Sequence, residues 1–465
     1  MRFRTNSRVR ATSAIGGVIA VGLLLAACGS SSDSGSTTAA APTTAAATTA
    51  APTDSAATTD AAATTDATPA TDATATTDAT ATTDAADPLG TPNKATGDPI
   101  IIGTINEAGS GAIDTQSANT LHGIKIAAEY LNDYRGGIGG HPITIVDCGN
   151  KATPAGATDC ANQMIEKQIN LYIEPYSGQE ATIVKILSPA GIPMVNGSSS
   201  SQEGLTMPGA FATTGGYPAT LGAFAIDAKA QGVKKFAMLT VDVPAATGAA
   251  QALGGIAFGK VGVEYTVIPI PLGTADITPM LQTAISGGAD AVAITGDASL
   301  CTTFLQGLKT LGADVKKYVI STCIDPTVIA AAGDVLDGAR VAVTRAPSDE
   351  DALFAATVEK YGESGDPTDV ATAGGIVDGW ATMMNAANIF EGYTGGIDNA
   401  SLLAQVKAAK DVPMVLSGGL TFTCDGTALS ILPNICSSQV QMGVLDAEGG
   451  VSGLTKIDAA EAYAP

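Results

Sequence analysis

Histidine is almost absent from this sequence of 465 residues, which contains only His122 and His141. Neither lies in an H-E-x-x-H zinc motif, and the sequence contains no G-x-S-x-G motif and no phosphate-binding P-loop. His122 falls in a predicted helix, where packing explains it, and His141 opens a predicted strand. The cysteine spacings do not match those of zinc sites. We therefore expect no enzymatic activity, no cofactor and no bound metal ion.

Positive charge is also scarce, because 23 Lys and Arg face 45 Asp and Glu, which gives a formal net charge of −22. Four of the arginines lie in residues 1–27, which contain no acidic residue, so removal of that segment would leave 19 − 45 = −26. Such a chain is repelled by the phosphates of nucleic acids. We therefore do not expect nucleic acid as a partner.

Long apolar runs are limited to residues 14–27, which follow a basic start. This run is shorter than the about 20 residues of a membrane-spanning helix, and its order is that of a secretory signal peptide. Its end, Leu25-Ala26-Ala27-Cys28, resembles the lipobox of bacterial lipoproteins. That resemblance implies cleavage after residue 27 and a diacylglycerol on Cys28, hence a lipid anchor on the extracytoplasmic face of the cell membrane. The alternative is an ordinary signal peptide cut near the same place.

The segment 28–98 has almost no residues that a core could bury, since it consists mainly of Ala, Thr, Ser, Pro, Asp and Gly. An aspartate recurs every six residues from Asp54 to Asp84. Such a composition predicts a disordered linker, because burial cannot offset the entropy of ordering. We expect it to tether the rest of the chain to the membrane, and the alternative is a simple repeat without a role.

Six cysteines follow Cys28, and an even number in an exported protein predicts disulfides. Fifteen connectivities are possible. We favour pairing in sequence order, and the alternative is free buried thiols. The six residues are Cys148, Cys160, Cys301, Cys323, Cys424 and Cys436.

The remaining residues, 99–465, alternate between strand and helix patterns and are too many for one core. This alternation predicts an α/β fold with two doubly wound parallel sheets, one in each of two lobes. Trp380 lies in a predicted helix, 374–390, which we assign to the core of the first lobe. The predicted strands are 98–105, 141–148, 171–177, 191–197, 234–242, 263–270, 289–297, 316–323 and 338–346, and the other predicted helices include 117–133, 157–169, 181–190, 277–286 and 302–312.

Three polar loops, 106–117, 176–180 and 196–204, follow predicted strands of the first lobe. Ligands of open α/β sheets bind at the carboxyl ends of the strands. Short hydroxyls and backbone N–H groups at helix starts suit an anion such as a ligand carboxylate. The candidate residues here are Ser177, Gly178, Gly197, Ser198, Ser199 and Ser200.

The alternative for two of these serines is helix capping. Ser177 lies three residues before Glu180, and Ser200 lies three residues before Glu203. Both spacings fit a capping box, in which the serine binds only the start of its own helix. Ser198 and Ser199 are therefore the better ligand candidates.

Residues 99 to about 440 resemble the type I periplasmic binding proteins of the branched-chain amino acid (leucine/isoleucine/valine) receptor family. The stretch IIIGTINEAGSG carries the resemblance, as do Asn132, Asp147, and the residues Gly136, Gly137, Ile138 and Gly139 of a Gly-Gly-Ile-x-Gly turn. The resemblance implies two lobes, joined by three crossovers, that close on a ligand. It assigns residues 99–217 and 347–415 to lobe 1, and residues 218–346 and 416–465 to lobe 2.

In that family, the loops that match Ser177 and Gly197–Ser200 hold the ligand carboxylate. The second lobe departs from the family pattern. Asp242 starts a loop that lacks the usual aromatic residue, and Ser321-Thr322-Cys323 stands where amino acid receptors place a carboxylate for the ligand ammonium. Asp297 and Asp325 are candidates to substitute for that carboxylate.

We therefore predict a monomeric, lipid-anchored solute-binding protein of an ABC transporter. It would capture a small polar solute, an amino acid or a related carboxylate or amide, and deliver it to a membrane permease. Three alternatives stay open: a ligand-sensing surface receptor without transport, an exported enzyme that uses Asp297 and Asp325, and a wall-interaction protein whose cleft has lost its ligand.

Overall fold

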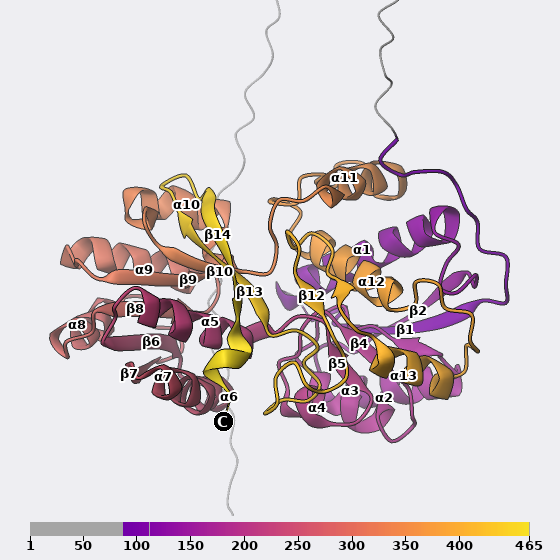
Figure 1. Cartoon of the computed structure of the whole chain (residues 1–465), viewed down its shortest axis with the longest axis horizontal. Coiled ribbons are helices and arrows are strands. Elements are labelled where there is room, and N and C mark those ends of the chain that lie inside the picture. Colours follow the sequence, from indigo (N-terminus) through magenta and orange to yellow (C-terminus); the bar gives the residue numbers. More distant parts are fainter. Residues whose placement is uncertain (1–86, 111, 465) are drawn as a thin grey trace, which may run out of the picture. The chain divides into compact units, whose positions relative to one another are not determined.

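The computed structural model describes residues 87–110 and 112–464, with side chains omitted from the description at 112–114. The predicted signal peptide, Cys28 and the linker up to residue 86 lie outside the described residues. Within the described part of the chain, no helix combines the length and hydrophobicity that a membrane span requires. The fold is two α/β lobes, each built on its own sheet, as the sequence predicted (Figure 1).

The first lobe is built on a five-stranded parallel sheet with the strand order β2-β1-β3-β4-β5. Its strands are β1 (Ile100–Asn106), β2 (Ile143–Gly149), β3 (Leu171–Tyr172), β4 (Met194–Asn196) and β5 (Ala210–Ala212). The helices that belong to it are α1 (Ala112–Tyr134), α2 (Pro154–Glu166), α3 (Glu180–Leu187), α4 (Gln202–Thr206), α11 (Glu350–Tyr361), α12 (Gly375–Ile389) and α13 (Asn399–Ala408).

Helices α1 and α12 lie side by side although about 240 residues separate their sequences (Figure 1). Two glycines permit this approach. A Cβ atom on Gly123 would lie 1.9 Å from the carbonyl oxygen of Ile376, and one on Gly379 would lie 1.8 Å from that of Thr120. Trp380 is fully buried beside this contact, in the core of the first lobe, which confirms its predicted place.

The second lobe is built on a seven-stranded sheet with the order β14-β13-β10-β9-β8-β6-β7. Its five parallel strands are β6 (Lys235–Val241), β7 (Glu264–Ile270), β8 (Ala291–Thr295), β9 (Lys316–Ile320) and β10 (Arg340–Val343). The last two strands, β13 (Gln439–Leu445) and β14 (Val451–Asp458), are antiparallel. The sequence predicted only parallel strands. Strand β13 instead enters the sheet after the third passage between the lobes and runs against β10, and a short turn then forms the β13–β14 hairpin.

The helical segments of the second lobe fill the connections between its strands. They are α5 (Gly216–Ala230), α6 (Pro244–Ala249), η1 (Ala250–Gly254), α7 (Gly255–Val261), α8 (Thr278–Ser286), α9 (Ala298–Leu311), η2 (Ser321–Ile324), α10 (Pro326–Ala332), η3 (Gly333–Leu336) and η4 (Ala459–Ala462).

The chain passes between the two sheets three times, after β5, after β10 and before β13. Two of these passages contact each other through the amide N–H of Ala346, which donates to the carbonyl of Leu416 at 3.0 Å. A small antiparallel pair, β11 (Val412–Pro413) and β12 (Thr421–Phe422), lies next to this contact. Leu416, Leu420 and Phe422 are buried in the core of the first lobe, although the sequence analysis placed residues 416–465 in the second.

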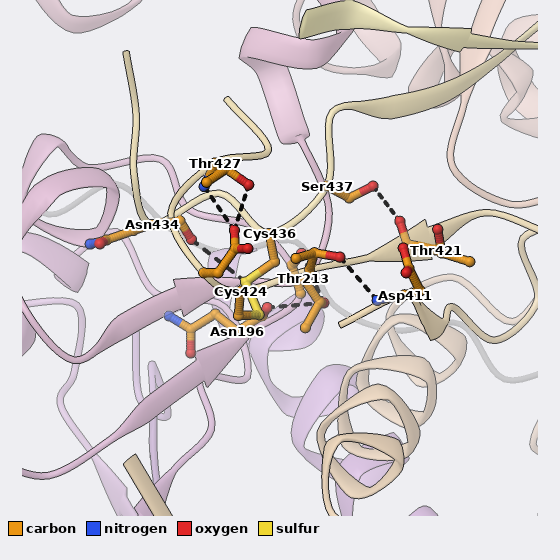
Figure 2. Close-up of a disulfide and its surroundings, with 12 residues drawn as sticks. Asn196, Thr213, Asp411, Thr421, Cys424, Thr427, Asn434, Cys436 and Ser437 are labelled. Atoms are coloured by element: carbon orange, nitrogen blue, oxygen red, sulfur yellow. Dashed lines mark hydrogen bonds between the residues drawn. A yellow bond between two sulfur atoms is a disulfide. The ribbon is translucent and has the colours of Figure 1, made fainter. Parts of the chain in front are cut away.

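All three disulfides predicted from sequence order are formed: Cys148–Cys160, Cys301–Cys323 and Cys424–Cys436. Figure 2 shows the last of these beside Asn196, the final residue of β4, and Thr213, which follows β5. The amide N–H of Cys436 donates to Ala212 at 2.8 Å, and the N–H of Thr423 donates to Cys436 at 2.7 Å. The disulfide therefore fixes a loop that is also bonded to the edge strand β5.

Candidate ligand-binding site

A cavity of about 320 Å³ lies at the carboxyl edge of the first sheet. Its walls come from the loops after β3, β4 and β5, from α1 and α12, from the crossover residues Thr344 and Arg345, and from Met414 and Val415. The volume is at the lower end of the range of small-molecule sites, about 300–1,000 Å³. The cavity therefore has the place and the size of a site for a small ligand.

The loop after β3 was predicted to be a strand up to residue 177, but the strand ends at Tyr172. Pro175 has no N–H group to continue the ladder, and Tyr176 adopts a left-handed conformation with φ of 86°. The carbonyl of Tyr176 accepts a hydrogen bond from Ser117 Oγ at 3.0 Å. This turn leaves the Tyr176 side chain 48% exposed at the cavity wall.

Glu180, the first residue of α3, receives the donors of the loop after β4. Its Oε2 atom accepts from the backbone N–H groups of Ser200 at 2.9 Å and Ser201 at 2.8 Å, and from Ser200 Oγ at 3.3 Å. Its Oε1 atom accepts from Ser199 Oγ at 2.6 Å. The glutamate is buried, so the chain itself supplies a carboxylate to these serines.

A second glutamate, Glu107, binds the loop after β3 in the same way. Its Oε1 atom accepts from the N–H of Gly178 at 2.6 Å and from Ser177 Oγ at 3.1 Å. Ser177 Oγ in turn accepts from Asn150 Nδ2 at 3.1 Å and from the N–H of Gln179 at 3.0 Å. The side chains of Glu107 and Ser177 are buried, so this network is a fixed part of the fold.

The cavity wall carries further charged groups. Arg345 forms an ion pair with Asp378 of α12, and desolvation lowers the pKa of Arg345 to about 10 although 36% of its side chain is exposed. Glu174 follows β3, and burial, followed by the charges of Glu180 and Glu107, raises its pKa well above its ordinary value. The cavity thus presents three carboxyl groups, Glu174, Glu180 and Asp378, beside one guanidinium.

Comparisons with known proteins agree with this geometry. The family model described as "Periplasmic binding protein" matches residues 99–430. The chain belongs to this family. No curated protein sequence shows significant similarity to the chain.

Solved structures show that this periplasmic binding protein shares its fold with several ABC transporter components. A substrate-binding protein from Sphaerobacter thermophilus is 19% identical, with a TM-score of 0.63 over 78% of this chain and 98% of its own. A branched-chain amino acid ABC transporter protein from Thermus thermophilus with bound valine is 15% identical, with a TM-score of 0.61 over 79% and 98%. A solute-binding protein from Rhodopseudomonas palustris HaA2 in complex with p-hydroxybenzoic acid is 18% identical, with a TM-score of 0.61 over 78% and 98%.

Four of the residues predicted to bind ligand in this periplasmic binding protein line the cavity: Ser177, Gly197, Ser198 and Ser200. Two more, Gly178 and Ser199, are not among the wall residues and bond to Glu107 and Glu180, respectively. The location predicted from the strand ends is thus the location of the cavity, and whether these residues contact a ligand stays a prediction.

The alternative that Ser177 and Ser200 serve only as helix caps is wrong. Helix α3 begins after Gln179, which makes no capping bond with its side chain. Helix α4 is capped by Ser201, whose Oγ accepts from the N–H of Gly204 at 2.9 Å. The capping box fails because Glu180 bonds across to the neighbouring loop rather than to Ser177.

The three candidates from the second lobe lie outside the cavity wall. Asp297 caps α9 by accepting from the N–H of Leu300 at 2.9 Å, and Asp325 caps α10 by accepting from the N–H of Thr327 at 2.8 Å. Asp242 is exposed after β6. Their role toward a ligand stays a prediction, but the carboxylates of Asp297 and Asp325 already accept hydrogen bonds as helix N-caps.

Most other wall residues were not predicted from the sequence, among them the polar groups Glu174, Tyr176, Arg345 and Asp378. Tyr176 lies in the predicted polar loop 176–180 and Glu174 shortly precedes it, so the position of this loop at a strand end could have indicated both residues. Arg345 and Asp378 come from a crossover and from α12, and no local pattern connects them. Across the described residues, no group of His, Cys, Asp and Glu side chains is arranged to hold a metal ion.

Proposed function

We propose that this protein is an extracytoplasmic, lipid-anchored receptor that takes a small polar solute into the cavity and delivers it to an ABC importer. The observation that carries the proposal is the cavity itself, at the carboxyl edge of the first sheet in a chain of the periplasmic binding protein family. The crossover residues Thr344 and Arg345 contribute to its wall, so a ligand in the cavity would lie against the segment where the chain passes between the lobes. Binding and release of this kind need no covalent step.

Two further observations support the importer and the anchor. Proteins of the same fold include a branched-chain amino acid ABC transporter protein with bound valine and an ABC transporter solute-binding protein in complex with p-hydroxybenzoic acid. The sequence Leu25-Ala26-Ala27-Cys28 supports lipidation of Cys28. If Cys28 carries the anchor, Cys28→Ser should move the protein from the detergent phase to the aqueous phase in a detergent phase-partition assay.

A thermal-shift screen of the full chain in detergent tests solute binding. The screen would cover amino acids, amides, amines, carboxylates, polyols and nucleosides. A ligand at a hundred times its dissociation constant adds about 2.7 kcal/mol, on the order of 3 °C for a chain of this size. Absence of any shift from a cooperatively folded sample would overturn the proposal.

A matched pair of variants ties a shift to the cavity. Ala381→Phe adds a ring to the cavity wall on α12 and should abolish the shift. Ala352→Phe adds the same ring at an exposed position of α11 and should leave it unchanged. Equal loss of binding in both variants would contradict the assignment of the cavity.

A further inference from the structure

The donors of Ser199, Ser200 and Ser201 at the cavity are already occupied by the chain's own carboxylate, Glu180. A carboxylate offers about four acceptor positions. Glu180 receives four hydrogen bonds, from Ser199 Oγ, from both Ser200 donors and from the N–H of Ser201. An incoming carboxylate would find these donors engaged and would meet a negative charge of the same kind.

The charge on the cavity wall favours the opposite sign. Arg345 is the only guanidinium or ammonium group among the wall residues, and it pairs with Asp378. This pairing leaves Glu180 and Glu174 without a cationic partner in the wall. A positively charged group in the cavity would be attracted by the carboxylate of Glu180, and it would favour release of the proton that the raised pKa leaves on Glu174. Both effects act in a site where solvent screening is reduced.

Glu174 supplies an acceptor that lacks a partner. Its Oε2 atom is buried and makes no hydrogen bond within residues 87–110 and 112–464. A buried acceptor left unpaired is unfavourable, and an N–H donor from a solute would satisfy it. Tyr172, Glu107 and Glu180 surround this carboxyl group, and Arg345 and Asp378 share the cavity wall with it.

Tyr176 adds an aromatic ring to the same wall. It is one of the few large apolar side chains that stay exposed in the described part of the chain. A cation over the face of an aromatic ring is stabilised by the electrons of that ring. An exposed tyrosine beside uncompensated carboxyl groups is therefore suited to a positively charged nitrogen.

From these contacts we infer that the solute of this receptor carries a positively charged nitrogen, held by Glu174 and Tyr176, and that the donors of Ser199–Ser201 do not bind a solute carboxylate. Glu180 takes the place of that carboxylate. The inference rests on the proposed function, because it assigns a chemical class to the solute of the same cavity.

Calorimetric titration of the full chain in detergent tests whether the cavity prefers a positively charged solute. The cations would be 1,4-diaminobutane, agmatine and choline, which offer a primary amine, a guanidinium and a quaternary ammonium. The controls would be 3,3-dimethylbutan-1-ol, a neutral isostere of choline, together with pentanamide and adipate. We expect at least one cation to bind at least about tenfold more tightly than every neutral or anionic compound.

The outcomes separate this inference from the proposed function. Tightest binding of a neutral or anionic compound would overturn the inference and leave the receptor function standing. Absence of binding by every compound here and in the broader thermal-shift screen would overturn the receptor function, and this inference with it.

Two variants test the roles of the glutamates directly. Glu180→Ala should free the serine donors, so that acetate stabilises this variant but neither the wild type nor the control Glu359→Ala, which alters an exposed residue of α11. Failure of acetate to stabilise a folded Glu180→Ala variant would overturn the role of Glu180.

Glu174→Gln keeps the size of the side chain, so it tests the inference even if Glu180→Ala does not fold. It should weaken binding of the cation about tenfold while binding of the neutral isostere stays the same. Unchanged affinity for the cation would overturn the role of Glu174.

Discussion

Replacement of Glu107 by alanine should destabilise the first lobe, because this buried carboxylate fixes the loop after β3. The substitution removes the acceptor of the Gly178 N–H and of Ser177 Oγ. Hydrogen bonds to a charged group contribute about 1.5–3 kcal/mol each, so the expected loss for two such bonds is about 3–6 kcal/mol. Glu107→Gln retains an amide oxygen as an acceptor and should cost about 1 kcal/mol.

The single tryptophan of the chain provides the assay. Trp380 is fully buried in the core of the first lobe, in edge-to-face contact with Phe354, so its fluorescence reports the unfolding of that lobe. For a urea dependence of roughly 3 kcal/mol per molar, a loss of about 3–6 kcal/mol lowers the unfolding midpoint by about 1–2 M.

The exposed glutamate Glu359 gives the matched control, since Glu359→Ala should stay within about 0.5 kcal/mol of the wild type. The reasoning would be refuted if Glu107→Ala unfolded at the same urea concentration as this control. A loss in Glu107→Gln as large as that in Glu107→Ala would show instead that the negative charge, rather than the acceptor geometry, stabilises the loop.

Three further predictions concern other parts of the molecule. Because the pKa of Glu174 is raised in the folded protein, the folded protein retains a proton that the unfolded chain releases above about pH 4.5. The free energy of unfolding should therefore fall as pH rises from that value toward the raised pKa. Glu174→Gln should remove this pH dependence in urea titrations between pH 5 and 8. Asp227→Ala should cost about 3–5 kcal/mol by circular dichroism, because it strands the guanidinium of Arg340 in the second lobe. Replacing Cys424 and Cys436 by serine should cost about 3 kcal/mol in urea unfolding, since this disulfide closes a loop with a sequence separation of 12 residues.

Each of these has a result that would contradict it. The Glu174 prediction fails if wild type and variant have the same pH dependence, and the Asp227 prediction fails if its loss is within that of an exposed aspartate such as Asp276→Ala. The disulfide prediction fails if the serine variant matches the wild type under oxidising conditions.

Much of the fold could be predicted because its signals are local. Apolar runs bounded by turn residues gave the strands β1, β6 and β8 close to their observed positions, since buried parallel strands read as continuous apolar segments. The pairing of the six cysteines also followed their order along the chain. The prediction was poorer where contacts with neighbouring segments determine the backbone conformation. In the segment 171–177, for example, the strand ends after two residues.

The candidate site shows the same limit in its chemistry. Ser177 and Glu180 have the spacing of a capping box, yet each bonds to a residue that is distant in sequence. The reason is that β3 and β4 are neighbours in the sheet, so the loops after them adjoin and Glu180 reaches Ser199–Ser201. Sequence spacing cannot report this contact, because it depends on strand order.

The sequence by itself determined the α/β class, the position of the polar loops at strand ends and the excess of negative charge, because periodicity, turn residues and composition are properties of the chain alone. The tertiary structure alone decided which groups those loops bind. Packing brings Glu107 and Glu180 to the serine donors and places Arg345 beside Asp378 of α12. A binding preference depends on which donors and charges are left unpaired, and that balance exists only once distant segments are folded together.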